Sequence, residues 1–157
     1  DAQQLAVVRR MTRDLDLPVE IVGLPIVREG DGVAMSSRNV YLSEEQRAAA
    51  HVLNRALSLA ERLFDASERD ARRIRAAMGD LIAAQPLAEV DYISIADATT
   101  LAEVDIITAP VLVSLAVRFG ATRLIDNAVL RVYSGSRQES DPFVGVAASR
   151  RRSTKGS

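Results

Sequence analysis

The sequence contains no cysteine, which excludes disulfide bonds and any metal site or nucleophile built on a thiol. No apolar run approaches the roughly 18 to 20 residues that a membrane-spanning helix needs, and the start shows no signal-peptide pattern. Because 20 lysines and arginines balance 21 acidic residues, the net charge of −1 does not favour nucleic acid or an anionic membrane surface as a partner. Together these absences are typical of a cytoplasmic protein.

Histidine is almost absent as well, because His51 is the only one in the chain. It lies within a predicted helix, beside Val52 and Leu53, and a histidine in an amphipathic helix needs no special function. We therefore expect His51 to be structural or on the surface.

What the sequence does contain is typical of a globular domain. The 157 residues are 48% hydrophobic and 26% charged, enough for one domain, or for one domain plus a piece of another. The chain begins at Asp1 without a methionine, so we expect either a processed chain or a piece of a longer one.

The first 24 residues predict half of an α/β unit. Apolar residues recur every three to four positions over residues 1–15, which predicts an amphipathic helix that ends before Pro18. Residues 19–24 are β-branched and almost continuously apolar, which predicts a buried strand. Such a strand needs neighbours, and we expect them from sequence outside this chain or from another chain.

The middle of the chain predicts two helices. Ser43 and Gln46 have the spacing of a capping box, and an apolar stripe then continues to about Phe64. A second helix is predicted from about Ser67 to Ile82, with a mostly solvated face formed by Arg69, Arg72, Arg73 and Arg75.

Beyond Pro86 the pattern predicts strands. They cover residues 90–97, 111–119 and 122–129, with a short helical turn over 97–103. Two helices followed by three strands predict an α+β domain whose helices pack on one face of a small, mainly antiparallel sheet. Residues 134–157 are rich in Ser, Gly and Arg, and we expect them to be a disordered, solvated tail rather than a site for an acidic partner.

The segment between the predicted strand at 19–24 and the helix that begins near Ser43 has the composition of a phosphate site. Gly30 and Gly32 permit unusual backbone angles, and Ser36, Ser37 and Arg38 offer two hydroxyls and a guanidinium just before a helix. The two nearby acidic residues could hold a cation or orient arginines. The residues alone leave open that the serines merely cap a turn.

The sequence of this segment, VREGDGVAMSSRN at residues 27–39, resembles the signature VREADGLAMSSRN of the pantothenate synthetase (pantoate–β-alanine ligase) family. In that family the SSR segment replaces the KMSKS loop of class I aminoacyl-tRNA synthetases. The family's GEKD-x-QQL segment is matched from its aspartate onward by residues 1–5, and a further match covers residues 120–127. The resemblance fades after about Val129.

The resemblance implies an organisation in four parts. An α/β nucleotidyltransferase-type (Rossmann-like) fragment is followed by a loop that binds phosphate and acts as a hinge through Gly30 and Gly32, and then by a lid that excludes water from the site. These parts are expected at residues 1–26, 27–42 and 43–133, with the tail at 134–157.

The resemblance also implies an activity. ATP and pantoate give pantoyl adenylate and pyrophosphate with magnesium, and β-alanine then attacks the adenylate to give pantothenate and AMP. By position, Ser36, Ser37 and Arg38 would bind the triphosphate and act in catalysis. Val27 and Met35 would border the adenine. Asp1 would lie by ATP and its magnesium, and Gln4 would bind pantoate, although Gln4 read alone could be an exposed helix residue.

Several family features do not occur in this sequence. It departs from the usual pattern at Ile26, Gly30 and Val40, none of which is an implied ligand. It has no HxGH loop, no lysine before Asp1 and no glutamine from earlier strands for pantoate. We therefore expect this chain to be inactive as a ligase when alone.

Two other functions remain open at this stage. The chain could be a non-catalytic, truncated interaction or dimerisation module, because family members are generally homodimers and the apolar strand lacks a partner. The missing N-terminal half is the other candidate partner. An RNA-binding function would rest only on the arginines of the tail.

Overall fold

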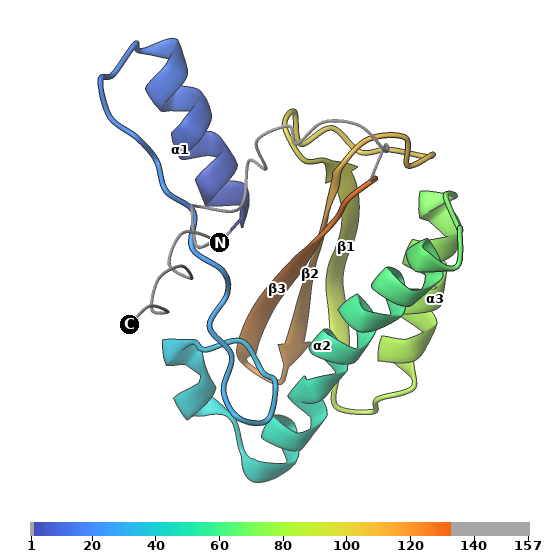
Figure 1. Cartoon of the computed structure of the whole chain (residues 1–157). Coiled ribbons are helices and arrows are strands. Elements are labelled where there is room, and N and C mark those ends of the chain that lie inside the picture. The colour runs from blue at the N-terminus through green and yellow to red at the C-terminus, as the bar shows by residue number, and fades with distance from the viewer. Residues whose placement is uncertain (1, 133–157) are drawn as a thin grey trace, which may run out of the picture.

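The computed structural model describes residues 2–132 of the 157. Its elements form two layers, a three-stranded sheet and a pair of helices packed against it, while the first helix stands apart (Figure 1). In chain order they are α1 (Ala2–Asp14), the 3₁₀ helix η1 (Ser37–Tyr41), α2 (Glu44–Asp65), α3 (Ala71–Ala83), β1 (Glu89–Asp97), β2 (Val111–Phe119) and β3 (Thr122–Leu130).

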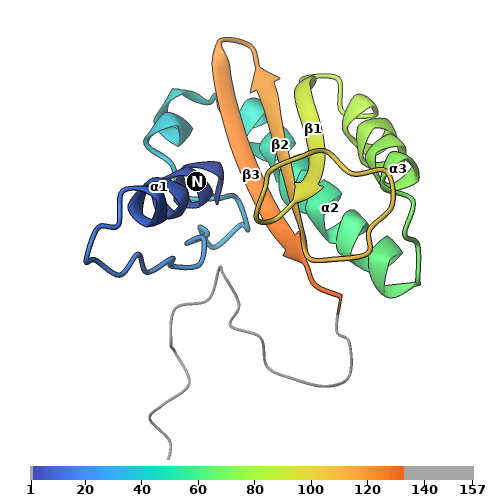
Figure 2. The same ribbon diagram turned by 90° about the horizontal axis from the view of Figure 1, so that it is seen from above.

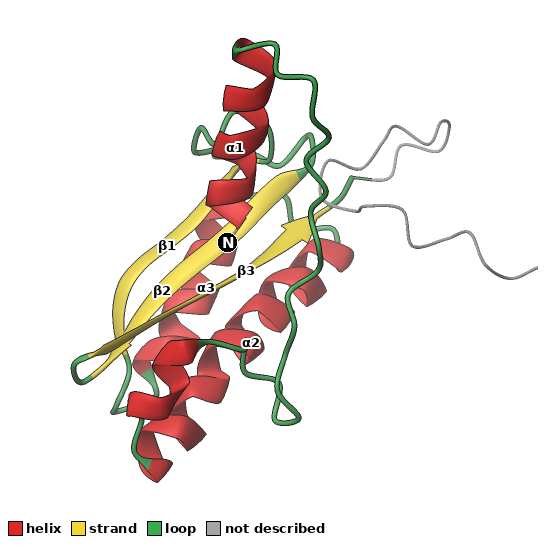
Figure 3. Ribbon diagram, turned by 90° about the vertical axis from the view of Figure 1, so that its left-hand side faces the viewer, coloured by secondary structure: helices red, strands yellow, loops and turns green. Residues whose placement is uncertain are grey.

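The sheet is antiparallel with the strand order β1-β2-β3. Strand β2 is central, and all its side chains except that of Arg118 are buried, which explains its continuous apolar sequence. Val113 lies opposite Ile95 on one side and Ala128 on the other, so these three residues share a face of the sheet. That face packs against α2 and α3 (Figure 3).

Helices α2 and α3 begin at side-chain caps. Ser43 Oγ accepts a hydrogen bond from the Gln46 amide while the Gln46 side chain accepts one from the Ser43 amide, which completes the predicted capping box. Asp70 caps α3 by accepting from the amides of Arg72 and Arg73. The fully buried side chains of the core that the helices form with the sheet include Ile74, Met78, Ile82, Ile95, Leu115 and Phe119.

The predicted α+β arrangement of residues 43–130 is confirmed, with two local corrections. Helix α3 begins at Ala71 rather than near Ser67, because Ser67 has a positive φ of 72° and Asp70 supplies the cap. Residues 97–103 form a hydrogen-bonded turn, not a helix, because Leu101 has a φ of 60° and Glu103 bridges back to Ala96.

The predicted solvated face of arginines is correct only in part. Arg72 and Arg73 are exposed, whereas Arg69 lies over the Phe64 ring at 4.0 Å. Arg75 is half-buried and donates to Glu103 Oε2 at 2.7 Å. These two side chains therefore join elements instead of facing water.

The prediction of a buried strand at residues 19–24 is wrong. No strand is found there, and Val19, Val22 and Leu24 are exposed, Leu24 by 82%. A β-branched run forms a strand only beside another strand, and the described residues place none next to it.

Helix α1 lies on the β3 side of the molecule, away from α2 and α3 (Figure 2). Its predicted apolar stripe is present, but Val7, Val8 and Met11 are exposed, as are Leu15 and Leu17 after it. None of the helices described over residues 2–132 is long and apolar enough to cross a membrane. The predicted tail at 134–157 lies outside the described residues.

Candidate functional site

Residues 27–35 form a small hairpin-like loop. Its two sides are joined by hydrogen bonds from the Met35 amide to the Val27 carbonyl, at 2.9 Å, and from the Glu29 amide to the Val33 carbonyl, at 2.9 Å. The Gly32 amide closes the tip by donating to the Glu29 carbonyl. Gly32 has a φ of 87°, a conformation that favours glycine, so the sequence Gly-Asp-Gly is suited to this turn.

One side of this loop is bonded to α2. Arg47 Nη2 donates to Glu29 Oε2 and to Asp31 Oδ2, both at 2.6 Å, and Asn54 Nδ2 donates to the Gly32 carbonyl at 2.8 Å. The hydrogen bonds from Arg47 lower the pKa of Glu29 and hold the pKa of Asp31 at about 2. The predicted acidic pair therefore orients an arginine. His51 is half-exposed on the surface, as predicted, 3.4 Å from Asp31.

The other side of the loop is bonded to β3. Arg28 Nη1 donates to Asp126 Oδ2 at 2.7 Å, and Arg28 Nη2 donates to Asp126 Oδ1 at 3.1 Å. The Asp126 side chain is only 2% exposed. Arg28 Nη1 also donates to the Gly32 carbonyl, so this guanidinium joins both sides of the loop to the sheet.

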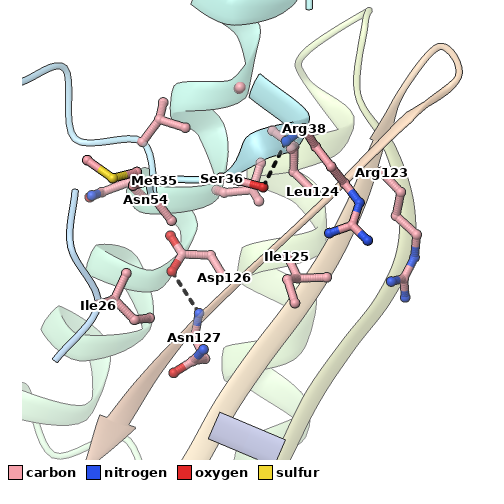
Figure 4. A pocket seen from close by; sticks show the side chains of 14 residues that line it. Ile26, Met35, Ser36, Arg38, Asn54, Arg123, Leu124, Ile125, Asp126 and Asn127 are labelled. Atoms are coloured by element: carbon pink, nitrogen blue, oxygen red, sulfur yellow. Dashed lines mark hydrogen bonds between the residues drawn. The ribbon is translucent and has the colours of Figure 1, made fainter. Parts of the chain in front are cut away.

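A cavity of about 190 Å³ lies between this loop, α2 and β3 (Figure 4). Met35, Ser36 and Arg38 line it from the loop, Asn54 lines it from α2, and residues 123–127 line it from β3. The walls are mostly apolar, and the hydroxyl, guanidinium and amide groups are few. A cavity of this kind holds one part of a small ligand and orients it with those polar groups.

Of the three residues expected to bind phosphate, the structure brings two to the cavity. Ser36 is half-buried and caps η1 by accepting from the Arg38 amide at 3.2 Å, which leaves its O–H able to donate. The Arg38 side chain is exposed, and among the described residues its guanidinium has no hydrogen-bond or ion-pair partner. Ser37 is exposed and does not line the cavity.

The remaining predicted site residues are placed as follows. Met35 lines the cavity; Val27 does not line it, but the Val27 carbonyl accepts a hydrogen bond from the Met35 amide. Gln4 is in the first turn of α1 and does not line this cavity. Asp1 lies outside the described residues.

A second, much smaller cavity, about 10 Å³, separates the start of α1 from the sheet. Ala2 and Gln3 line it, together with Tyr92, Ser114 and residues 125–127 of β3. Ser114 Oγ is buried there without a hydrogen-bond partner. Residues 125–127 therefore line both cavities.

The described residues contain no group of three or more histidine or acidic side chains that could hold a metal ion. Glu29 and Asp31 are the acids nearest Ser36 in sequence, and both are bound to Arg47.

The residues that hold the loop in place are not evident from the sequence alone. Arg28 and Asp126 are 98 positions apart, so no local pattern connects them. Arg47 was also missed, because a single arginine on an amphipathic helix looks like any solvated residue. The only available signal for Asp126 was its position in the segment at 120–127 that resembles the family.

Comparisons with known proteins agree with this arrangement. The family model described as pantoate-beta-alanine ligase matches residues 1–129. The chain is 56% identical over 132 residues to a pantothenate synthetase of Heliobacterium modesticaldum, and 60% identical over 130 residues to one of a Roseiflexus species. These matches cover 84% and 83% of this chain and 47% of each relative.

A solved structure supports the fold independently. The crystal structure of pantothenate synthetase from Thermus thermophilus matches with a TM-score of 0.75 and 45% identity, over 84% of this chain and 47% of that chain. The chain thus spans about half the length of the relatives it matches. It belongs to the pantoate–β-alanine ligase family.

Proposed function

We propose that this chain supplies the phosphate-binding loop and the lid of a pantothenate synthetase. The reaction is the ATP-dependent ligation of pantoate and β-alanine through a pantoyl adenylate, giving pantothenate, AMP and pyrophosphate. The observation that carries the proposal is the cavity that Met35, Ser36 and Arg38 line together, with the guanidinium unpaired within the described part of the chain. The compartment proposed for this protein is the cytoplasm.

Each of these residues has a chemical role in the proposal. Attack of a carboxylate on the α-phosphate gains little from covalent assistance, so the protein contributes mainly position and positive charge. Arg38 binds the phosphate chain because a planar guanidinium meets phosphate oxygens in pairs. Ser36 and Ser37 bind it through hydroxyl and backbone N–H groups, and Val27 and Met35 border the adenine.

The rest of the composite site lies in a nucleotidyltransferase-type, Rossmann-like half, of which residues 1–26 are the end. Asp1 and Gln4 face ATP and pantoate from that side. Magnesium neutralises the phosphates in this family, and Asp1 is the residue of this chain proposed to lie near it. Because the HxGH half of the site is not in this sequence, the chain alone binds ATP weakly and forms no pantothenate.

Binding and turnover test these claims separately. ATP titration, followed by calorimetry or by NMR shifts, should detect weak binding that Arg38→Ala weakens by about 10- to 100-fold, because a charge-assisted hydrogen bond contributes about 1.5–3 kcal/mol. Arg55→Ala, an exposed arginine on α2, should bind ATP like the wild type. AMP release with pantoate and β-alanine should be absent, and clear turnover by the 157-residue chain would refute the half-site.

The alternative function is association without catalysis, as a dimerisation module or as a partner of the N-terminal half. The exposed apolar residues of α1 and of residues 15–26 favour it. Light scattering with and without ATP separates the two functions, since a module that only associates should be indifferent to nucleotide.

A further inference from the structure

The bonds that fix the phosphate-binding loop run to the second half of this chain. Arg28 reaches Asp126 on β3, while Arg47 and Asn54 reach the loop from α2. The extended residues before the loop take part in no strand and expose most of their side chains. The loop is therefore attached to the lid more firmly than to α1.

The pair formed by Arg28 and Asp126 is the most buried of these attachments. Two parallel hydrogen bonds fix the angle between guanidinium and carboxylate as well as their separation. The carboxylate is also satisfied by the Asn127 amide, at 2.8 Å, and the guanidinium by the Gly32 carbonyl. The pair joins a partly exposed guanidinium to a buried carboxylate, and any other arrangement would leave that buried charge unpaired.

Asn39 connects η1 to the loop that Arg28 and Asp126 hold in place. Its Nδ2 donates to Glu29 Oε1 at 2.6 Å and to the Ala34 carbonyl at 3.1 Å, so η1 is bonded to both sides of the loop. Arg38 is the residue before Asn39, and Ser36 caps the same short helix. Bonded contacts therefore run from Asp126 through the loop to Ser36 and Arg38.

We propose that Arg28 and Asp126 are positioning residues that fix Ser36 and Arg38 to the lid. The phosphate-binding segment and the lid then move as one body, because the pair and the bonds from Arg47 and Asn54 join the loop to β3 and α2. This inference rests on the proposed function only in assigning phosphate to Ser36 and Arg38. The joint motion rests on the bonds themselves.

The experiment uses the 157-residue chain with Asp126→Asn and Arg28→Lys. Asparagine keeps the shape of the aspartate without its charge, and lysine keeps the charge of the arginine without its fork. The matched control is Glu103→Gln, which alters a carboxylate that binds Arg75 on α3, remote from the loop. Amide hydrogen exchange is measured at Met35 and Asn39, with Val113 in β2 as the internal reference, and ATP and inorganic tripolyphosphate are titrated into each variant.

We expect exchange at Met35 and Asn39 to accelerate about tenfold in both variants, with Val113 nearly unchanged and with clearly weaker binding of both anions. Glu103→Gln should match the wild type in loop exchange and in anion binding. Unchanged exchange in folded Asp126→Asn and Arg28→Lys would overturn the proposal, as would faster exchange with unaltered anion binding.

The design separates this inference from the proposed function. If the wild type binds neither anion, the proposed phosphate site fails, and hydrogen exchange alone decides whether the pair fixes the loop. If the wild type binds both anions and the two variants bind them equally well, the phosphate site stands and the positioning role fails.

Discussion

At the scale of single residues, two glycines separated by one position in the loop have different reasons to be glycine. Gly32 has a φ of 87°, and an added Cβ would lie 3.3 Å from Asn54 Nδ2, the atom that donates to the Gly32 carbonyl. Gly30 has no atom within 4 Å of such a Cβ. Only Gly32 is therefore required by the backbone and by its neighbour.

Gly32→Ala should lower the free energy of unfolding by about 1–2 kcal/mol, because an L-residue is strained in the left-handed region and the contact with Asn54 is tight. Gly30→Ala is the matched control and should change it by less than about 0.5 kcal/mol. Urea unfolding followed by circular dichroism measures both. Equal losses for the two variants would show that the loop does not have the described turn.

The charged residues of the loop predict a pH dependence. Hydrogen bonds from Arg47, the largest cause, and from the Val33 amide lower the pKa of Asp31 from 3.8 to about 2, so the ionised carboxylate stabilises the folded state. That contribution is complete above pH 3.8 and is lost as the pH falls through about 2. A carbon-detected NMR titration of Asp31 should place its midpoint near the lower value.

The substitution Arg47→Met removes the hydrogen bonds that lower the pKa of Asp31 and so tests their effect. The Asp31 midpoint should return toward 3.8 in this variant, since its largest cause of depression is gone. A midpoint that stays near 2 would mean that the Val33 amide, which also donates to Asp31, holds the pKa without Arg47.

At the scale of elements, local signals located the helices and strands of residues 43–130 well. Ser43 and Gln46 marked the start of α2, and the apolar run at 111–119 coincides with β2. The run at 19–24 failed because strand formation depends on a neighbour, which no local pattern reveals. The pair of Arg28 and Asp126 could not be predicted for the same reason, since only the fold brings these two residues together.

The cap of α2 gives a prediction at this scale. Ser43→Ala removes the acceptor for the Gln46 amide and should lower the free energy of unfolding by about 1 kcal/mol. Ser58→Ala is the control, because Ser58 lies within α2 and its hydroxyl makes only a long contact, 3.4 Å, with Asn54 Oδ1. Thermal or urea unfolding compares the two, and a larger loss at Ser58 would contradict this account of where α2 is held.

At the scale of the whole molecule, stability is distributed unevenly. The sheet, α2 and α3 share one buried core, and the loop at 27–39 is bonded to it. Residues 15–26 form no helix or strand, and most of their side chains are exposed. Segments with few buried contacts open at low free energy, so this connection is the weakest part of the described chain.

Limited proteolysis should find that weakness. Thermolysin, which cuts before apolar residues, should cleave first among the apolar residues of 15–26 and leave a resistant core that contains residues 27–130. Mass spectrometry identifies the new N-terminus. Early cleavage within the loop at 30–37 would show instead that the loop is the flexible part, as the hinge prediction from Gly30 and Gly32 requires.

Residues 15–26 also affect whether the isolated chain associates with itself in solution. Leu15, Val19, Val22 and Leu24 are apolar and exposed, and exposed apolar residues gathered in one segment favour association. We expect concentration-dependent association of the 157-residue chain in light scattering, reduced by the double substitution Leu15→Ser and Leu24→Ser. Leu87→Ser, at an exposed leucine beyond α3, should leave the association unchanged. If all three chains associate equally, the contact surface lies elsewhere, and the exposed N-terminal segment no longer supports the dimerisation alternative.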